Sequence, residues 1–179
     1  MPIPATPTLL TLVMLGAPRS AIEDELDSMA ERLAPPSPDP GGFLGIVWRS
    51  VAGLRDRQRD RELGELAACL NGLCSPHGEI WGVELARRLG PELDFANQER
   101  ALWAASRLGC ADLALAIGAI LPLESRASVL AQASIWAGAA GKQSACERIA
   151  AAAGAWRERS ELEAANSGAP ARPAPRARL

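Results

Sequence analysis

Aromatic and strand-forming residues are scarce in this sequence. It contains no tyrosine, two phenylalanines and five tryptophans, so aromatic residues make up 4% of its 179 residues. β-Branched residues are also few, and no segment shows a sustained alternation of apolar and polar residues, which would predict a strand. Alanine, leucine, arginine and glutamate dominate instead, and these residues favour helix. The sequence therefore predicts an all-α fold.

An excess of charge of either sign is also absent, because 19 basic and 21 acidic residues give a net charge of −2. No overall charge steers the chain toward nucleic acid or an anionic membrane. The run from Arg55 to Glu62 alternates bases with acids, which indicates a solvated helix or helix junction. Arg172, Arg176 and Arg178 lie in a segment whose composition favours disorder, with contact to an anion or an acidic groove as the alternative. We expect no nucleic-acid partner.

The apolar run "TLLTLVMLGAP" near the N-terminus is too short to span a bilayer. No lysine or arginine precedes it, so it lacks the positive region of a signal peptide, and we expect it to form the first helix of the domain. A helix that is apolar nearly all round must be buried in its own body, in a partner or in a membrane surface. Contact of residues 8–16 with a membrane is therefore one alternative for this segment.

The four cysteines are too few for a disulfide framework in a chain of this length. We expect free, mostly buried thiols in a reducing compartment, and hence a cytoplasmic protein. Cys69, Cys74 and the only histidine, His77, are spaced so that they resemble part of a zinc site. However, Cys69 shares a helical side with Leu66, Leu70 and Leu73, which favours a core stripe, and no second ligand pair exists.

The segment "APPSPDPGG" divides the chain, because its prolines and glycines cannot continue a helix. We expect an N-terminal helical hairpin over residues 1–33, a linker or loop over residues 34–42 and a main helical body over residues 43–165. Residues 166–179 are rich in proline, alanine and arginine and have almost nothing to bury, which predicts a disordered tail.

Local signals also predict where helices begin and end. Helix starts are expected at residues that can cap or open a helix: Thr6 with Pro7, Ser20 with Glu23 as a capping box, Asn97 and Asp112. Helix ends are expected at glycines and prolines that stop a helix: Gly16, Gly90 with Pro91, Gly109, Pro122 and Gly141.

A weak internal repeat appears when Gly109 is aligned with Gly141. Trp103 and Trp136 are then 33 residues apart, and two further tryptophans, Trp48 and Trp81, have the same separation. All four tryptophans follow a valine, isoleucine or leucine. Periods of this length are typical of stacked helical units, each of which needs a neighbour to bury its second face.

The repeat resembles the helical-hairpin repeat superfamily, and the tetratricopeptide repeats most of all. In that family a glycine ends the first helix and a small residue five positions later packs the second helix against it, as Gly109 with Ala114 and Gly141 with Cys146 would do here. The tryptophan lies nearer the glycine than in the family, and the terminal proline comes early, at Pro122. The resemblance covers residues 98–160 and implies antiparallel hairpins stacked as a short repeat array. An irregular helical bundle is the alternative.

No combination of residues predicts catalysis. His77 lies in a Pro/Gly turn, no pair of carboxylates is spaced within an apolar stretch, and "GGFLG" lacks the lysine of a phosphate loop. We therefore expect no enzyme, catalytic residue, metal or cofactor. A small metalloprotein or enzyme that uses Cys69, Cys74 and His77 is the alternative.

The sequence favours a non-enzymatic protein–protein interaction module, acting as an adaptor, a chaperone or a subunit of a larger assembly. We expect it to bind a protein partner, or a second copy of itself, in a groove between helices. Large aromatic residues either fill the core of helical hairpins or line such a groove. The candidate binding residues are therefore the repeated tryptophans and the apolar residues of the first helix: Trp48, Trp81, Trp103, Trp136, Leu9, Leu12 and Val13. The second alternative is a membrane-peripheral subunit anchored by that helix.

Overall fold

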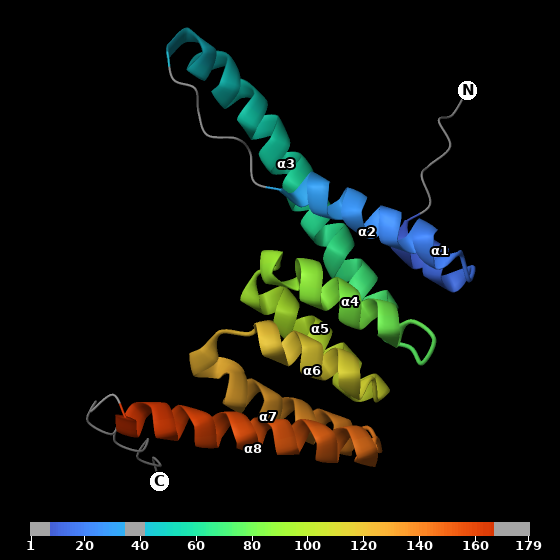
Figure 1. Ribbon diagram of the computed structural model, residues 1–179, viewed down its shortest axis with the longest axis vertical. Coiled ribbons are helices and arrows are strands. Elements are labelled where there is room, and N and C mark those ends of the chain that lie inside the picture. Colours follow the sequence, from blue (N-terminus) through green and yellow to red (C-terminus); the bar gives the residue numbers. More distant parts are fainter. Residues whose placement is uncertain (1–7, 35–41, 167–179) are drawn as a thin grey trace.

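The computed structural model describes residues 8–34 and 42–166, together with the side chains of residues 8–34 and 57–165. Every regular element in these ranges is a helix, which confirms the all-α prediction (Figure 1). In chain order the elements are α1 (Leu9–Met14), α2 (Arg19–Leu33), α3 (Gly42–Gly72), α4 (Glu79–Leu89), the 3₁₀ turn η1 (Gly90–Glu92), α5 (Phe95–Leu108), α6 (Ala111–Ile120), α7 (Leu123–Ala139) and α8 (Gln143–Asn166). The predictions for the linker after Ala34 and for the tail after Asn166 lie outside the described residues.

Three hairpin turns have the same backbone geometry. Gly16, Gly109 and Gly141 have φ angles of 65°, 83° and 73°, in the left-handed region that glycine adopts without strain. The residue after each glycine donates its N–H to a carbonyl five residues earlier, as in the 2.9 Å bonds from Cys110 to Ala105 and from Lys142 to Ala137. This pattern is a Schellman motif, which ends a helix and reverses the chain. The predicted helix ends at these glycines are confirmed.

Several predicted helix starts are wrong. Thr8 caps α1, whereas Thr6 and Pro7 lie outside the described residues. Ser20 and Glu23 form no capping box, because α2 already begins at Arg19 and the Glu23 carboxylate accepts a 2.7 Å hydrogen bond from Arg19 Nε.

The start of α5 was also predicted at the wrong residue. Asp94 caps this helix, and its Oδ1 accepts a 2.8 Å bond from the N–H of Asn97, so Asn97 is the donor within the cap.

The mixed-charge run from Arg55 to Glu62 lies within α3, and this helix continues through the run without a junction.

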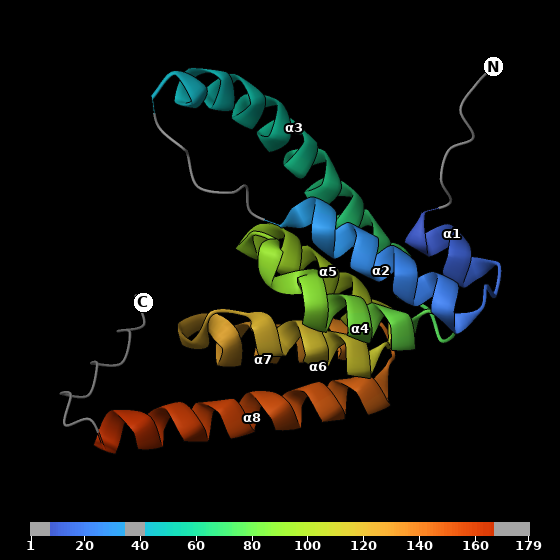
Figure 2. The same cartoon turned by 45° about the horizontal axis from the view of Figure 1, so that its top comes forward.

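Each helix packs against its partner in a hairpin and against the helix two places along the chain. α1, α3, α5 and α7 contact one another in succession, and so do α2, α4, α6 and α8. In Figures 1 and 2 the helices follow one another from α1, α2 and α3 at one end to α7 and α8 at the other. One continuous core extends through them, from Leu9 in α1 to Ala153 in α8.

The N-terminal hairpin packs on the main body rather than standing apart from it. Leu9 is 1% exposed, and a Cβ placed on Gly72 of α3 would lie 2.6 Å from Leu10 Cδ2. Arg32 of α2 adds an ion pair of 3.0 Å to Glu62, a buried residue of α3.

Helices α4 and α6 are parallel and in direct contact along their length. Gly82 lies against Leu113 near the start of both helices, and Gly90 lies against Ile120 near the end of both. A Cβ on Gly90 would come within 2.4 Å of Ile120 Cδ1, so a larger residue at this position would require the end of the Ile120 side chain to move.

We predict that Gly141→Ala lowers the free energy of unfolding by about 1 kcal/mol, because alanine is strained at positive φ. No heavy atom lies within 4 Å of the added methyl group, so the effect comes from the backbone alone. The matched control is Gly154→Ala within α8, which also meets no atom within 4 Å but has an ordinary helical backbone. It should raise the free energy of unfolding by about 0.5 kcal/mol. Urea unfolding followed by circular dichroism measures both, and effects of equal sign would contradict this account.

Candidate functional site

The start of α6 is capped by a side chain from another helix. Glu79 of α4 extends its carboxylate to this end, and Oε1 accepts hydrogen bonds from the N–H groups of Asp112 (2.9 Å) and Leu113 (3.3 Å). A carboxylate at a helix N-terminus is stabilised both by these bonds and by the helix dipole. Cys110, at the N-cap position, offers no side-chain bond. The prediction that Asp112 caps α6 is therefore wrong, and Asp112 instead pairs with Arg148 of α8.

The end of α6 is capped in the same way by a cation. Arg126 of α7 donates to the carbonyl oxygens of Ala119 (2.6 Å) and Leu121 (2.7 Å), where the helix has no backbone cap of its own. Burial lowers the pKa of Arg126, and its guanidinium also lies 4.2 Å from the ring centre of Trp156. Both ends of α6 are thus held by charged side chains of neighbouring helices, with the signs that the helix dipole favours.

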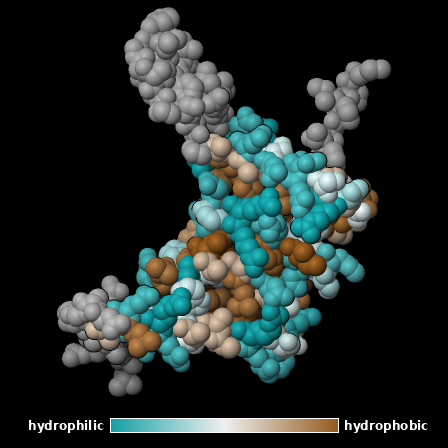
Figure 3. Space-filling model, viewed as in Figure 1, coloured by the Kyte–Doolittle hydropathy of each residue, from teal (hydrophilic) through white to brown (hydrophobic). Residues whose placement is uncertain are grey.

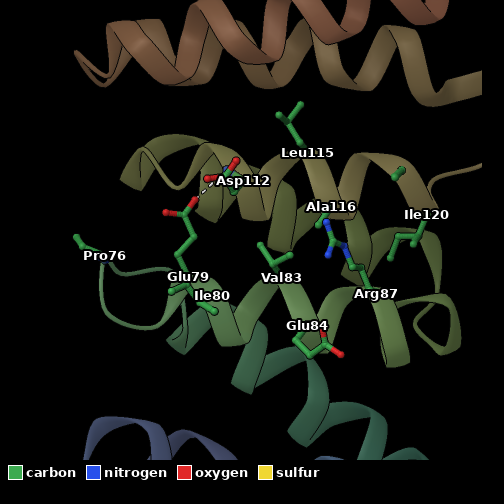
Figure 4. Close-up of a pocket in the computed structure, with 11 residues that line it drawn as sticks. Pro76, Glu79, Ile80, Val83, Glu84, Arg87, Asp112, Leu115, Ala116 and Ile120 are labelled. Carbon is green, nitrogen blue, oxygen red and sulfur yellow. Dashed lines mark hydrogen bonds between the residues drawn. The ribbon is translucent and has the colours of Figure 1, made fainter. Parts of the chain in front are cut away.

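An open cleft of about 660 Å³ lies between the parallel helices α4 and α6 (Figure 4). We call it the α4–α6 cleft. Its lining residues come from α4, from α6 and from the turn before α4: Pro76, Glu79, Ile80, Val83, Glu84, Arg87, Asp112, Leu115, Ala116, Ala119 and Ile120. Figure 3 shows hydrophobic residues gathered across the middle of the molecule, where Figure 1 places α4 to α6.

Each helix presents one complete face to the cleft. The lining residues of α4 are at positions 79, 80, 83, 84 and 87, and those of α6 are at positions 112, 115, 116, 119 and 120, which is the spacing of one helical side. Val83 and the small residues Ala116 and Ala119 leave room between the helices, and Ile80 is 76% exposed at the edge. An aliphatic side chain this exposed beside an apolar cleft indicates a contact surface.

Of the four charged lining residues, only Arg87 has neither an ion pair nor a side-chain hydrogen bond among the described residues. Glu79 binds the amides of α6, Glu84 accepts a 2.5 Å bond from Arg88 and Asp112 pairs with Arg148. Figure 4 shows the Arg87 side chain extending from α4 toward α6, beside Ala116. The cleft therefore has carboxylates near the starts of its helices and a free guanidinium near their ends.

Two of the predicted tryptophans form a second, smaller surface. Trp103 of α5 and Trp136 of α7 pack edge to face with ring centres 6.5 Å apart, and Arg107 lies 4.7 Å above the ring of Trp103. With Ala139 and Ala140 they line a shallow cleft of about 230 Å³. Trp103 is 43% exposed, and the prediction that it binds a partner stays a prediction.

Trp81 and the predicted residues of α1 do not join this surface. Trp81 is half-buried, with the guanidinium of Arg19 at 5.9 Å from its ring centre, and the side chain of Trp48 lies outside the described residues. Leu9 is buried in the core, and two half-buried residues of α1 pack against that core, Leu12 and Val13. None of the described helices is both long enough and apolar enough to cross a membrane.

The thiols suit a core rather than a reactive site. Burial, then neighbouring Cys110 and Glu79, raises the pKa of Cys74 to about 12, and burial together with Glu79 raises that of Cys110 to about 11. Cys74 donates its thiol to the Leu70 carbonyl at 3.3 Å, while His77 is exposed in the turn. Within residues 8–34 and 57–165, no group of three or more His, Cys, Asp or Glu side chains could hold a metal ion.

None of the binding residues predicted from the sequence lines the α4–α6 cleft. A signal was nevertheless present, because α4 has apolar residues on two faces. Leu85 and Leu89 face the core, while Ile80 and Val83 are on the other side. A short helix with two apolar faces needs a second neighbour, and in α4 that second face lines the cleft.

Comparisons with known proteins give no relative, since no family model, curated protein or solved structure matches the chain. The tetratricopeptide resemblance therefore stays a prediction, and the geometry of the cleft is the basis for assigning a function.

We predict that Glu79→Ala lowers the free energy of unfolding by about 1 kcal/mol, because two amides at the start of α6 lose their acceptor. Glu79→Gln should have a smaller effect, since an amide oxygen still accepts the bonds but carries no charge. Glu84→Ala is the control on the same helix, and loss of its exposed pair with Arg88 should cost less than about 0.5 kcal/mol. Chemical unfolding measures all three, and equal losses for Glu79→Ala and Glu84→Ala would contradict the capping role.

We predict that alkaline pH destabilises the protein partly through Cys74. An unfolded thiol loses its proton above its ordinary pKa of 9.0, whereas the folded thiol keeps it until about pH 12, so stability falls as pH rises between these values. Cys74→Ser keeps a donor for the Leu70 carbonyl but does not titrate in this range. Between about pH 8 and about pH 10, the wild-type protein should lose about 1 kcal/mol more than Cys74→Ser in urea unfolding. Identical losses would exclude this contribution.

Proposed function

We propose that this chain is a non-enzymatic protein–protein interaction module that buries an apolar helical segment of another polypeptide in the α4–α6 cleft. The observation that carries the proposal is the pair of parallel helices that line it, each with a complete face and with exposed Ile80 at the edge. Recognition of a helix in an apolar groove uses this arrangement, with anchor residues repeating at helical spacing.

The dimensions of the cleft fit such a ligand. Helix α6 has ten residues, so the groove is about 15 Å long and holds about three turns of a docked helix. The small side chains of Ala116 and Ala119 allow the backbone of a ligand helix to approach closely. The ligand face should therefore carry medium-sized apolar residues.

Rigidity of the walls also favours this function. The two walls are joined at one end by the bonds from Glu79 to the amides of α6, and Arg126 holds the other end of α6. A groove that is already formed loses little conformational entropy when it binds, which increases affinity.

The proposal includes a short array of helical hairpins, similar to tetratricopeptide repeats, that serves as an adaptor, a chaperone or a subunit of an assembly. It is supported by the matching turns at Gly109 and Gly141 and by the contacts between alternate helices. The alternative that uses Cys69, Cys74 and His77 has less support, because both thiols are buried and the histidine is exposed in the turn that follows them.

Site-specific photo-crosslinking tests the proposal. With a photoreactive phenylalanine derivative at position 80, irradiation of cells of the source organism should give one dominant adduct, and the crosslinked peptide should map to an amphipathic helix. Ala119→Arg should remove the adduct, because the arginine side chain fills the cleft while the helix is retained. Mass spectrometry measures both outcomes.

Two matched controls accompany this experiment. The same probe at Ile135, which is 61% exposed on α7 and outside the described clefts, should give little adduct. Ala68→Arg, on the exposed side of α3, should leave the adduct from position 80 unchanged. Equal yields from positions 80 and 135, or an adduct that survives Ala119→Arg, would contradict the proposed function.

A further inference from the structure

Arg107 of α5 lies over an aromatic ring and has no carboxylate partner. Its guanidinium is 4.7 Å from the ring centre of Trp103, and it makes neither an ion pair nor a side-chain hydrogen bond with the described residues. A guanidinium on a ring still has N–H groups that can bind a carboxylate through two hydrogen bonds. The ring contact also restricts the side chain before a ligand arrives, so less entropy is lost on binding.

Two further cations lie near the same end of α5. Arg100 precedes Arg107 by seven residues, which places both on one exposed side of the helix. The stem of Lys142 crosses the turn at Gly109, where its Cδ is 3.1 Å from the position of a Cβ. Both cations are exposed and have no ion pair within the part of the chain that the structure describes. The single acid of α5, Glu99, is half-buried, so positive charge prevails on this surface.

The rings of Trp103 and Trp136 form an apolar corner between these cations. They meet edge to face, with 6.5 Å between ring centres and 82° between ring planes. With Arg107, Ala139 and Ala140 they line the shallow cleft of about 230 Å³, which we call the Trp103–Trp136 cleft. Its small alanines leave room for one apolar side chain rather than for a docked helix. An aromatic or large aliphatic side chain placed there would bury ring surface that is now exposed.

We infer that the Trp103–Trp136 cleft binds an acidic peptide segment of another protein. One aromatic or large aliphatic residue of the segment enters the corner, and carboxylates beside it bind Arg107, Lys142 and Arg100. The charge complementarity and the single apolar corner identify this class of ligand together. The cleft lies between α5 and α7, a different pair of helices from the α4–α6 cleft, so the inference goes beyond the proposed function and does not depend on it.

Single-stranded nucleic acid is the other anionic ligand that binds tryptophans and arginines, and the geometry favours the peptide. A strand needs open ring faces on which successive bases stack, together with a track of cations along its phosphates. Here Arg107 already covers one face of Trp103, and the two rings pack edge to face on each other. The corner therefore suits one inserted side chain better than a series of stacked bases.

Peptide selection tests the inference. A library of random dodecapeptides displayed on phage is selected on the immobilised full-length chain, and phage that also bind Arg107→Glu are removed. Enriched peptides should contain one aromatic or large aliphatic residue flanked by at least two acids. A selection that enriches no such peptide overturns the inference.

Affinity measurements then test the contact with Arg107. The most enriched peptide is labelled with fluorescein, and its binding is followed by fluorescence anisotropy. Arg107→Gln should weaken binding about tenfold, because a carboxylate of the peptide loses its charged partner. With a second peptide, in which glutamine and asparagine replace the acids, the same substitution should change affinity less than about twofold. Equal losses for the two peptides would contradict pairing between Arg107 and a carboxylate.

Matched variants separate this contact from general effects. Arg61→Gln removes the same charge at an exposed position of α3 and should leave both affinities unchanged. Arg107→Lys keeps the charge but not the forked N–H groups, so it should lose less than Arg107→Gln. Circular dichroism verifies that each variant is folded.

Two further measurements identify the site and the ligand class. Ala119→Arg, which fills the α4–α6 cleft, should leave the affinity for the acidic peptide unchanged. A loss with Ala119→Arg but none with Arg107→Gln would place the peptide in the other cleft and overturn the inference. A fluorescein-labelled oligothymidylate that binds as tightly as the peptide, and that Arg107→Gln weakens equally, would assign the surface to nucleic acid and also overturn it.

Discussion

The arrangement of this protein depends on the way both ends of α6 are satisfied by neighbouring helices. An α-helix leaves N–H groups free at its start and carbonyl groups free at its end, and burying them without partners is costly. Helix α6 is almost entirely apolar and has no side-chain cap of its own. Glu79 supplies the missing acceptor and Arg126 the missing donor, each from another hairpin. Hydrogen bonding at the ends of one helix thus links three hairpins to one another, in addition to the core that they share.

The cleft follows from the same constraint. Glycines at positions 82 and 90 allow α4 to approach α6 on the core side, while the outward faces diverge enough to leave a groove. Glu79 belongs to both features, since it caps α6 and also forms the acidic end of the groove. A residue that stabilises the fold therefore also contributes to the electrostatic character of the surface. Substitutions at this position would change stability and recognition together, whereas changes at Arg87 affect the surface alone.

The sequence was most informative where structure is determined locally. The helix ends at Gly109 and Gly141 could be predicted, because only glycine adopts positive φ without strain. The cap of α6 could not, because its acceptor lies 33 residues earlier in the chain, in another helix. The cleft was missed for a related reason. Whether Ile80 or Leu85 faces the core depends on where the neighbouring helices pack, and the apolar pattern of α4 alone does not decide it.

The contacts between helices close in sequence have a consequence for how the chain folds. Because the main contacts join helices no more than two places apart, few long loops need to close before a hairpin gains its neighbours. Such proteins fold rapidly, and their unfolding need not be all-or-none, because each unit is stabilised mainly by the units beside it. Among the described helices, the hairpin of α7 and α8 has a neighbour on one side only. Amide protons there should exchange by opening of this hairpin while the middle of the molecule stays closed, so this end is the first part of the main body to become accessible to proteases and chaperones.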